Sequence, residues 1–368
     1  MTKDLGISEL NFDQFVKKYQ RVPVKEYPNC VSDSLPSPEI TVRVITYQHA
    51  PYIKKCLEGI LMQETEIPFE IVIGEDDSTD GTKEICIEYA KRYPDKIRLF
   101  LNDRKNNIQF MGSPTARFNV VYTKLKSRGR LSAFCEGDDH WTDPQKLEKQ
   151  YRLMEKHPEC NLSFHPALIE WGSDKKRAEI FKRHKDHNHI YTVSDIIEGG
   201  GEFCPSNSLM VRGNVESVYE WQLQTPVGDY FSQVLASLNG GALYINDVMS
   251  VYRKKVPGSW SKRKNSFLER AEHMIHMCRG MHILDRQTGY RYHKSFRNRE
   301  NFVLKKYAVF PAFSYGNETV KELLKLIRVI EIRSLKLNCY WYFFLSFLYY
   351  RLRLKKVFKI KNQMTGKI

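Results

Sequence analysis

The feature of this sequence that most constrains its fold is a regular alternation of strand-like and helix-like segments, which begins at Ile40. Runs of β-branched and other apolar residues predict buried strands at 40–47, 68–75, 96–102 and 130–139. Amphipathic runs between them predict helices at 51–64, 81–94 and 113–127. This alternation is typical of a parallel, doubly wound α/β sheet with helices on both faces.

The pattern is less regular after residue 150. We predict a helix at 143–158, strands at 161–171 and 202–212, and a helix at 227–239. Residues 172–190 are highly charged and predict a surface loop, whereas residues 242–253 predict a hairpin that turns at Asn246 and Asp247.

Charge divides the chain unequally. Residues 1–250 hold 31 Lys and Arg against 36 Asp and Glu, whereas residues 251–368 hold 27 against 7. The excess positive charge therefore belongs to the last third, which suits an anionic membrane surface, a phosphorylated lipid or a nucleic acid. We predict an N-terminal arm at 1–38, an α/β domain at 39–261 and a basic, mainly helical region at 262–368.

The cysteines and the N-terminus indicate the cellular compartment in which the protein would be found. The eight cysteines show no paired spacing, which argues against a disulfide framework or a zinc site and favours a reducing environment. The N-terminus has no basic start followed by an apolar run, so we expect no signal peptide. These features predict a cytoplasmic protein.

Two acidic clusters follow predicted strands. The first is Glu75-Asp76-Asp77 with Asp80, and the second is Glu136, Asp138 and Asp139. Ligands of doubly wound sheets bind beyond the carboxyl ends of the strands, and carboxylates are ligands of Mg²⁺ and Mn²⁺. The alternative for each cluster is a surface turn that caps the next helix.

Three segments resemble, in order, the motifs of family 2 glycosyltransferases. Residues 42–63 resemble the opening strand, turn and first helix, and residues 70–85 resemble the second strand and its Asp-Asp-Gly-Ser-x-Asp motif. Residues 134–150 resemble the Asp-x-Asp metal motif and the helix after it. The resemblance extends from Ile40 to Ser261 and implies a GT-A-type, Rossmann-like, mostly parallel sheet with a helical basic C-terminal extension.

The resemblance implies a nucleotide-sugar donor site. Thr46 and Tyr47 would line the nucleobase pocket, with Tyr47 packing on uracil. Asp76 would accept a hydrogen bond from the base, and Glu75 would support this pocket.

The resemblance also implies a metal site. Asp138 and Asp139 would hold Mn²⁺ or Mg²⁺ and the ribose-diphosphate, with Glu136 in the outer acid position. The sequence departs from the family pattern here, because Glu136 replaces an Asp. It also departs in the first two motifs, where Gln48 replaces an Asn and Asp77 replaces a Gly.

Further site residues follow from the same resemblance. Asp229 would be the general base of an inverting transfer, although it is equally placed to cap the helix that it begins. Asn207 and Ser208 are candidates for the acceptor side. Separately from the resemblance, Arg253 and Trp260 belong to a cationic Pro-Gly segment that is a candidate lid over the donor diphosphate.

Segment 337–361 is the most distinctive part of the basic region. Residues 337–350 are apolar and aromatic but fall short of the roughly 20 residues needed to cross a bilayer. A basic stretch, 351–361, follows. The segment is either a packed helix or an interfacial anchor, and we favour peripheral association with the anionic inner face of the cell membrane.

These observations predict an inverting, metal-dependent transferase that moves a sugar from a nucleotide-sugar, most simply a UDP-sugar, to a saccharide or lipid-linked saccharide acceptor in polysaccharide biosynthesis. One alternative is a nucleotidyltransferase that makes a nucleotide-sugar, but the first turn lacks the Gly-rich loop of such enzymes. Another is a nucleic-acid-binding protein that uses its basic tail, against which the apolar run in that tail argues. We therefore expect no nucleic-acid partner.

Overall fold

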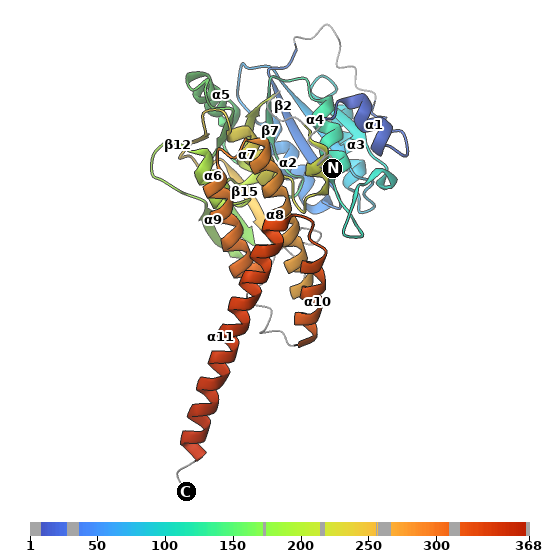
Figure 1. Ribbon diagram of the computed structural model, residues 1–368. Helices are drawn as coiled ribbons and strands as arrows, with labels where there is room; N and C mark the ends of the chain where they lie inside the picture. Colours follow the sequence, from blue (N-terminus) through green and yellow to red (C-terminus); the bar gives the residue numbers. More distant parts are fainter. Residues whose placement is uncertain are drawn as a thin grey trace. The chain divides into compact units, whose positions relative to one another are not determined.

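The computed structural model describes residues 9–27, 37–171, 174–213, 218–254, 256, 266–308 and 317–365. The chain divides into two compact units. The first comprises Met1–Gln224 and Gly228–Arg263, and the second comprises Thr225–Val227 and Lys264–Ile368. Figure 1 labels helices of both units and some of the strands.

The first unit is built on four parallel strands, in the order β4-β3-β2-β7. These strands are β2 (Ile40–Thr46), β3 (Phe69–Glu75), β4 (Ile97–Leu101) and β7 (Leu131–Phe134). The helices between them are α2 (Ala50–Leu61), α3 (Thr82–Arg92) and α4 (Arg117–Lys126). The predicted doubly wound α/β architecture is therefore confirmed, together with all seven of these elements.

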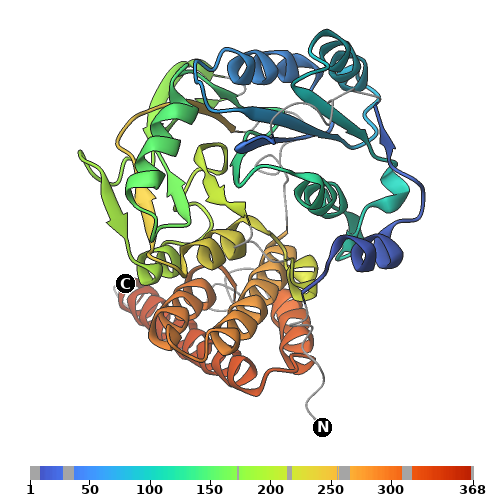
Figure 2. The ribbon, with the colours of Figure 1, turned by 90° about the horizontal axis from the view of Figure 1, so that it is seen from above.

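Helices cover both faces of the parallel strands (Figure 2). Ile71 and Ile73 of β3 pack with α2, α3 and α5 (Lys146–Lys156), whereas Val72 packs with α4 and with α1 (Phe12–Tyr19). Successive residues of a strand point to opposite faces, so a continuous apolar run is required where both faces are covered. This requirement explains the β-branched sequences of these strands.

The sheet continues beyond β7 with mixed polarity. β13 (Met210–Arg212) is antiparallel to both β7 and β9 (Leu162–Phe164), and β14 (Ala242–Tyr244) is parallel to β9. β12 (His189–Tyr191) and β1 (Lys25–Glu26) form the two edges of this nine-stranded sheet. Two helices, α6 (Val193–Gly199) and α7 (Asp229–Ser237), pack against each other in this half.

A second sheet of four strands corrects three sequence predictions. Its order is β11 (Asp174–Phe181), β10 (Ala167–Trp171), β15 (Ser250–Lys254) and β8 (His140–Trp141). The predicted strand 161–171 is divided between the two sheets, and the predicted loop 172–190 contains β11. The predicted hairpin 242–253 is also wrong, because β14 and β15 belong to different sheets and pair with β9 and β10. Two short strands, β5 (Gln109–Phe110) and β6 (Ser113–Pro114), pair separately.

The described part of the second unit is helical, as predicted. It contains α8 (Phe267–Gln287), α9 (His293–Val303), α10 (Asn317–Arg328) and α11 (Arg333–Thr365). Glu300 of α9 accepts hydrogen bonds from His282 of α8 and from Asn338 of α11, and it therefore ties three helices together. Among the described residues, no helix is both long enough and apolar enough to cross a bilayer.

Candidate active site

The two acidic clusters lie at one edge of the parallel strands. β2 and β3 end side by side, with Thr46 opposite Glu75, and the amide of Asp76 donates to the carbonyl of Thr46 over 3.1 Å. The chain that leaves β7 remains beside β2, because the amide of Gly137 donates to the carbonyl of Ile45 over 3.0 Å. Both clusters are therefore at the carboxyl end of the sheet, where α/β proteins bind ligands.

The turn after β3 is organised by Glu75, whose carboxylate is fully buried. It accepts hydrogen bonds from the backbone amides of Asp77 at 3.1 Å and Ser78 at 2.7 Å, while burial raises its pKa. Asp77 and Gln48 have positive φ angles of 59° and 55°. Gly and Asn adopt positive φ angles most readily. Asp77 replaces a Gly of the family motif and Gln48 replaces an Asn, so both positions keep a backbone conformation that suits the family residue.

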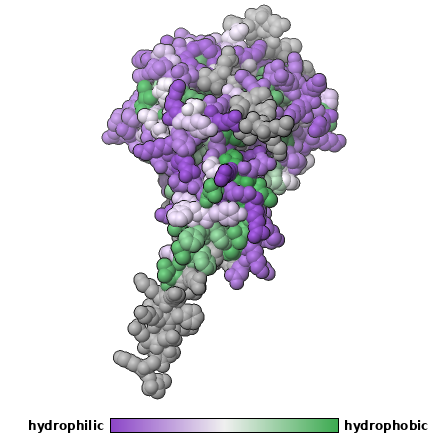
Figure 3. Space-filling view, in the orientation of Figure 1, coloured by the Kyte–Doolittle hydropathy of each residue, from purple (hydrophilic) through white to green (hydrophobic). Residues whose placement is uncertain are grey.

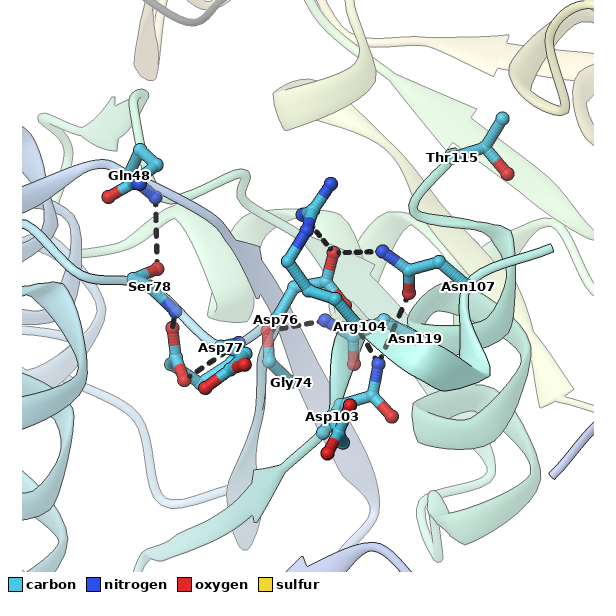
Figure 4. A network of polar contacts seen from close by, with 12 residues as sticks. Gln48, Gly74, Asp76, Asp77, Ser78, Asp103, Arg104, Asn107, Thr115 and Asn119 are labelled. Carbon is cyan, nitrogen blue, oxygen red and sulfur yellow. Dashed lines mark hydrogen bonds and ion pairs between the residues drawn. The ribbon is translucent and has the colours of Figure 1, made fainter. Parts of the chain in front are cut away.

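Asp76 is the centre of a buried polar network (Figure 4). One carboxylate oxygen accepts a hydrogen bond from Asn102 at 2.7 Å, and the other accepts from Asn107 at 2.8 Å and from Arg104 at 3.0 Å. The guanidinium of Arg104 also lies 3.9 Å from the ring centroid of Tyr47. The guanidinium of Arg104 therefore contacts both Tyr47 and Asp76.

The residues that surround Asp76 were not among those predicted from the sequence. Asn102, Arg104 and Asn107 belong to a polar run, NDRKNN (102–107), which begins at the last residue of the third predicted strand. Its position at the end of a parallel strand was a usable signal. Burial raises the pKa of Asp76, whereas the three donors favour its ionised form.

The second acidic cluster (Glu136, Asp138 and Asp139) follows β7. Asp139 is almost fully buried; its Oδ1 accepts a hydrogen bond from the amide of Arg253 at 2.8 Å. Its Oδ2 is also buried and has no hydrogen-bond partner among the described residues. Oε2 of Glu136 accepts a hydrogen bond from the hydroxyl of Ser206 at 3.1 Å, a contact that sequence analysis missed.

The second acidic cluster is crowded with negative charge. Burial raises the pKa of Glu136, and the charges of Asp229 and Asp138 raise it further. Burial also raises the pKa of Asp139, with Asp138 and Glu136 adding to the effect. Like charges at close range favour protonation of one partner or binding of a cation.

Two histidines beside the second acidic cluster do not neutralise it. His49 Nε2 lies 4.0 Å from Asp138 Oδ1, but burial lowers the pKa of His49 despite this carboxylate. Burial, Arg253 and Lys55 lower the pKa of His140 to about 3. Both imidazoles are therefore neutral at pH 7, so neither supplies a positive charge.

The chemistry of the cluster fits a hard divalent cation. Asp138 is partly exposed and the adjacent Asp139 has a buried oxygen without a hydrogen-bond partner, so both can offer carboxylate oxygens. Within the described part of the chain, no group of three or more His, Cys, Asp or Glu side chains is arranged to hold a metal ion. A cation bound here would need further ligands, such as water and phosphate oxygens, as Mg²⁺ commonly has.

Gly137 connects the two clusters by close packing. A Cβ atom at this position would lie 2.4 Å from Oγ1 of Thr46 and 2.8 Å from Nδ1 of His49. Real Cβ atoms do not approach other atoms so closely. A glycine between Glu136 and Asp138 is therefore required for the second cluster to lie beside the end of β2.

Asp229 is the first residue of α7 and is exposed. Surrounding protein removes part of its hydration, which raises its pKa. The negative charge of Asp229 contributes to the raised pKa of Glu136 in the second acidic cluster.

Asn207 and Ser208 lie differently from the acceptor-side arrangement that we expected. Both are fully buried, and the amide of Asn207 bonds to the carbonyl of Val251 and the hydroxyl of Ser250. The hydroxyl of Ser208 donates to the carbonyl of Pro205 over 2.6 Å. Because these polar groups are engaged within the protein, we assign both residues to the framework behind the site.

The expected lid is corrected in one respect. Arg253 lies on β15 rather than in a loop, and only 9% of its surface is exposed. Its guanidinium donates to the carbonyl of Asp138 over 2.6 Å and pairs with Glu170 at 3.0 Å. Trp260, the other lid candidate, lies outside the described residues.

Comparisons with known proteins agree with this architecture. Residues 41–109 match the family model described as glycosyl transferase family 2. An uncharacterised protein of Mycobacterium tuberculosis is 33% identical over 218 residues, which are 59% of each chain. The protein of Bacillus subtilis named as the teichuronic acid biosynthesis glycosyltransferase TuaG is 30% identical over 127 residues, which cover 34% of this chain and 46% of TuaG.

A solved structure shares the fold. Staphylococcus aureus TarS 1–349, crystallised in complex with UDP-GlcNAc, has a TM-score of 0.56 with 14% identity, covering 85% of this chain and 92% of that chain. The match over residues 41–109 and the partial likeness to TuaG show that this part of the chain is similar to family 2 glycosyltransferases, and the likeness to TarS shows a shared α/β fold. The chain spans 59% of the length of its mycobacterial relative.

Proposed function

We propose that the protein transfers a sugar from a UDP-linked donor to a saccharide or lipid-linked saccharide acceptor, with inversion at the anomeric carbon. The observation that carries this proposal is the meeting of two clusters at one sheet edge. Arg104 contacts both the buried Asp76 and Tyr47. The second acidic cluster follows β7, which pairs with β2, the strand that precedes Tyr47. A nucleobase subsite and a diphosphate subsite at adjacent strand ends suit a nucleotide-sugar.

The first cluster would bind the nucleoside. Uracil would stack on Tyr47, and its N3–H would donate to the carboxylate of Asp76, which is already held in place by two asparagine amides. Thr46 and Glu75 would support this pocket from the ends of β2 and β3. Arg104 would have to leave the face of Tyr47 or share it with the base.

The second acidic cluster would bind the ribose and diphosphate. Asp138 and Asp139 would hold Mn²⁺ or Mg²⁺, and Glu136 would contact the ribose. The bound cation would stabilise the negative charge that develops on the departing diphosphate. Asp138 has the more accessible carboxylate, so we assign it the more direct contact with the donor.

Asp229 would act as the general base. The acceptor hydroxyl would transfer its proton to this carboxylate as its oxygen forms a bond to the anomeric carbon. The bond between that carbon and the diphosphate oxygen would break on the opposite face, so the nucleoside diphosphate leaves and the configuration inverts. The raised pKa of Asp229 brings its basicity closer to neutral pH, which favours such a transfer.

The second unit would bring the enzyme to a membrane surface. Leu337, Trp341, Phe344 and Leu348 are exposed and recur at helical spacing along α11. Apolar side chains gather along the described part of this helix in the space-filling view (Figure 3). The basic residues of 351–361 follow in the sequence, a composition that suits the inner face of a membrane rich in anionic lipids. A polysaccharide pathway, as TuaG's name indicates for that protein, would supply an acceptor there.

Titration calorimetry with UDP-, GDP- and CDP-sugars, in the presence of Mn²⁺ or of EDTA, tests the donor site. We expect binding of the UDP-sugars that requires Mn²⁺ and falls at least about tenfold in Asp138→Asn. Asp95→Asn, an exposed acid in the turn before β4, is the matched control for loss of one charge. Metal-independent binding, or equal losses in both variants, would refute the assignment.

Formation of a glycoside of inverted configuration by wild type, lost in Asp229→Asn, tests the transfer step.

A further inference from the structure

The second sheet carries an aromatic pair that the proposed donor site does not use. Phe181 of β11 and Tyr252 of β15 lie on the same face of this sheet, because they pair in register with Ala167 and Ile169, two residues apart on the intervening strand β10. Their ring centroids are 5.8 Å apart, and the ring planes differ by 12°. Both side chains are half-buried.

Ammonium groups approach these rings. Nζ of Lys254 lies 4.1 Å from the centroid of Phe181 and 5.7 Å from that of Tyr252, and Nζ of Lys182 lies 5.1 Å from that of Phe181. Lys254 is also 3.9 Å from the exposed carboxylate of Glu202. A lysine over an aromatic face is a cover that a ligand can displace, because its stem is flexible and its ammonium readily exchanges partners.

The strand that carries Tyr252 runs beside the second acidic cluster. Arg253, between Tyr252 and Lys254, donates its backbone amide to Asp139 over 2.8 Å and its guanidinium to the carbonyl of Asp138 over 2.6 Å. Burial raises the pKa of the Tyr252 phenol, and the carboxylates of the second acidic cluster and of Asp229 raise it further. The phenol therefore lies within the electrostatic influence of the groups that would perform the transfer.

We propose that Phe181, Tyr252 and Lys254 form the subsite for the acceptor saccharide. The C–H groups on one face of a pyranose ring are apolar, and they would pack on the two nearly parallel aromatic rings. Lys254 would donate hydrogen bonds to ring hydroxyls or to an anionic substituent, and a hydroxyl of the same saccharide would be directed toward Asp229. This inference rests on the proposed function, because it assigns the acceptor to that same site.

The charge of the subsite predicts a preference among saccharides. Two ammonium groups lie within about 5 Å of Phe181, so an acidic pyranoside gains an attraction that a neutral one lacks. We therefore expect methyl β-D-glucuronide to bind better than methyl β-D-glucoside. Equal affinity for the glucuronide and the glucoside would show that Lys254 does not contact the ligand.

Saturation-transfer difference NMR on the full chain with Mn²⁺ and UDP tests the subsite directly. The probes are the methyl β-glycosides of glucose, galactose, N-acetylglucosamine and glucuronic acid. Saturation of aromatic protein protons should reach the C–H protons of one face of at least one probe. Phe181→Ala should weaken that binding about tenfold. Ile180→Ala, which removes an exposed side chain from the adjacent position on the same strand, should leave it unchanged.

Two further measurements separate the parts of the proposal. Tyr252→Phe retains the ring, so saccharide binding should stay within about twofold of wild type if stacking is the main contact. Binding of UDP by each variant, followed by calorimetry, reports the donor site independently. Loss of saccharide binding in Phe181→Ala with UDP affinity retained supports the subsite. Failure of wild type to bind UDP would refute the proposed function alone. Absence of saturation transfer to every probe, or equal losses in Phe181→Ala and Ile180→Ala, would overturn the subsite.

Discussion

The guanidinium of Arg104 lies 3.9 Å from the ring centroid of Tyr47, across the aromatic face on which we propose that uracil stacks. The same guanidinium pairs with Asp76 at 3.0 Å. An aromatic ring and a carboxylate offer what a uracil requires, namely a stacking surface and an acceptor for its N3–H. In this structure Arg104 uses both groups, so nucleotide binding must rearrange its side chain.

We predict that Asp76→Asn destabilises the first unit and weakens nucleotide binding. The amide that replaces one carboxylate oxygen would be a donor facing the donors of Asn102, Asn107 or Arg104. A buried mismatch of this kind costs about 1–3 kcal/mol. Urea denaturation should report the lost stability, and calorimetry with UDP should report at least about tenfold weaker binding.

Asp77→Asn is the control for that substitution. Its carboxylate is about half-exposed and pairs with Lys83 at 2.6 Å, a surface contact that contributes at most about 1 kcal/mol. If Asp77→Asn weakens UDP binding as much as Asp76→Asn does, then a general loss of negative charge, rather than a specific base contact, explains the effect.

We predict that Gly137→Ala disturbs both subsites together. The new methyl group would press against Thr46 and His49, so β2 and the second acidic cluster must separate locally. Overpacking of this kind costs about 1–3 kcal/mol. Thermal unfolding should show the destabilisation, and Mn²⁺-dependent UDP binding should weaken. Gly201→Ala is the control, because its nearest contact, 3.4 Å from Cβ of Tyr230, is of ordinary length. Equal effects of the two substitutions would contradict the explanation.

A buried lysine predicts how stability depends on pH. Lys146 is fully buried; its ammonium donates to Gln150 and lies 4.0 Å from the ring centroid of Trp141. Burial lowers its pKa to about 7, whereas an unfolded lysine has a pKa of about 10.4. Between these values the unfolded chain binds a proton that the folded chain does not, so the free energy of unfolding rises with pH above about 7.

The slope from this one group approaches about 1.4 kcal/mol per pH unit. Buried thiols with raised pKa values, such as those of Cys86 and Cys135, oppose it once cysteines of the unfolded chain ionise near pH 8.5. Urea denaturation between pH 7 and about 8.5 should therefore show wild type gaining stability relative to Lys146→Met. Parallel pH profiles for the two proteins would show that Lys146 keeps an ordinary pKa in the folded chain.

The parallel half of the fold was predictable because its signals are local. β2, β3, β4 and β7 are apolar runs that alternate with helices, and this alternation is typical of a parallel sheet even where β2 pairs with β7 across about ninety residues. The second sheet was not predictable, because no such alternation marks its strands: β10 pairs with β11, which follows it directly, and with β15, which lies about eighty residues later. Pro166, which lies where the predicted strand 161–171 divides between two sheets, was a usable local signal, because proline has no amide hydrogen to donate within a central strand.

The candidate site likewise has a part with local sequence signals and a part that depends on contacts between distant residues. The acidic motifs are contiguous, so their positions at strand ends could be predicted from the sequence. The position of Arg104 near a strand end was a usable signal, but its contact with Tyr47 could not be predicted. Tyr252 could not be assigned from the sequence, because its importance depends on contact with Phe181 on another strand. Asn207 was assigned to the acceptor side from its place in a motif, although its burial depends on packing against β15.

The exposed face of α11 leads to the final prediction. Trp341 and Phe344 have 55% and 50% of their surfaces exposed, on the side of the helix opposite the buried Leu335 and Cys339. Burial of one such side chain in a lipid interface is worth about 1.5–3 kcal/mol. In flotation assays with liposomes that contain anionic phosphatidylglycerol, we expect wild type to bind and the double variant Trp341→Ser/Phe344→Ser to lose most of that binding.

Varying the salt concentration and the lipid charge separates the electrostatic from the apolar contribution to membrane binding. Attraction between the basic residues of 351–361 and anionic lipid should weaken as salt shortens the Debye length from about 10 Å at 0.1 M, whereas the apolar contribution should not. Val329→Ser removes an apolar side chain that is 74% exposed and precedes α11, so it should leave flotation unchanged. Binding that survives the double variant, or falls equally in Val329→Ser, would show that α11 does not provide the membrane contact.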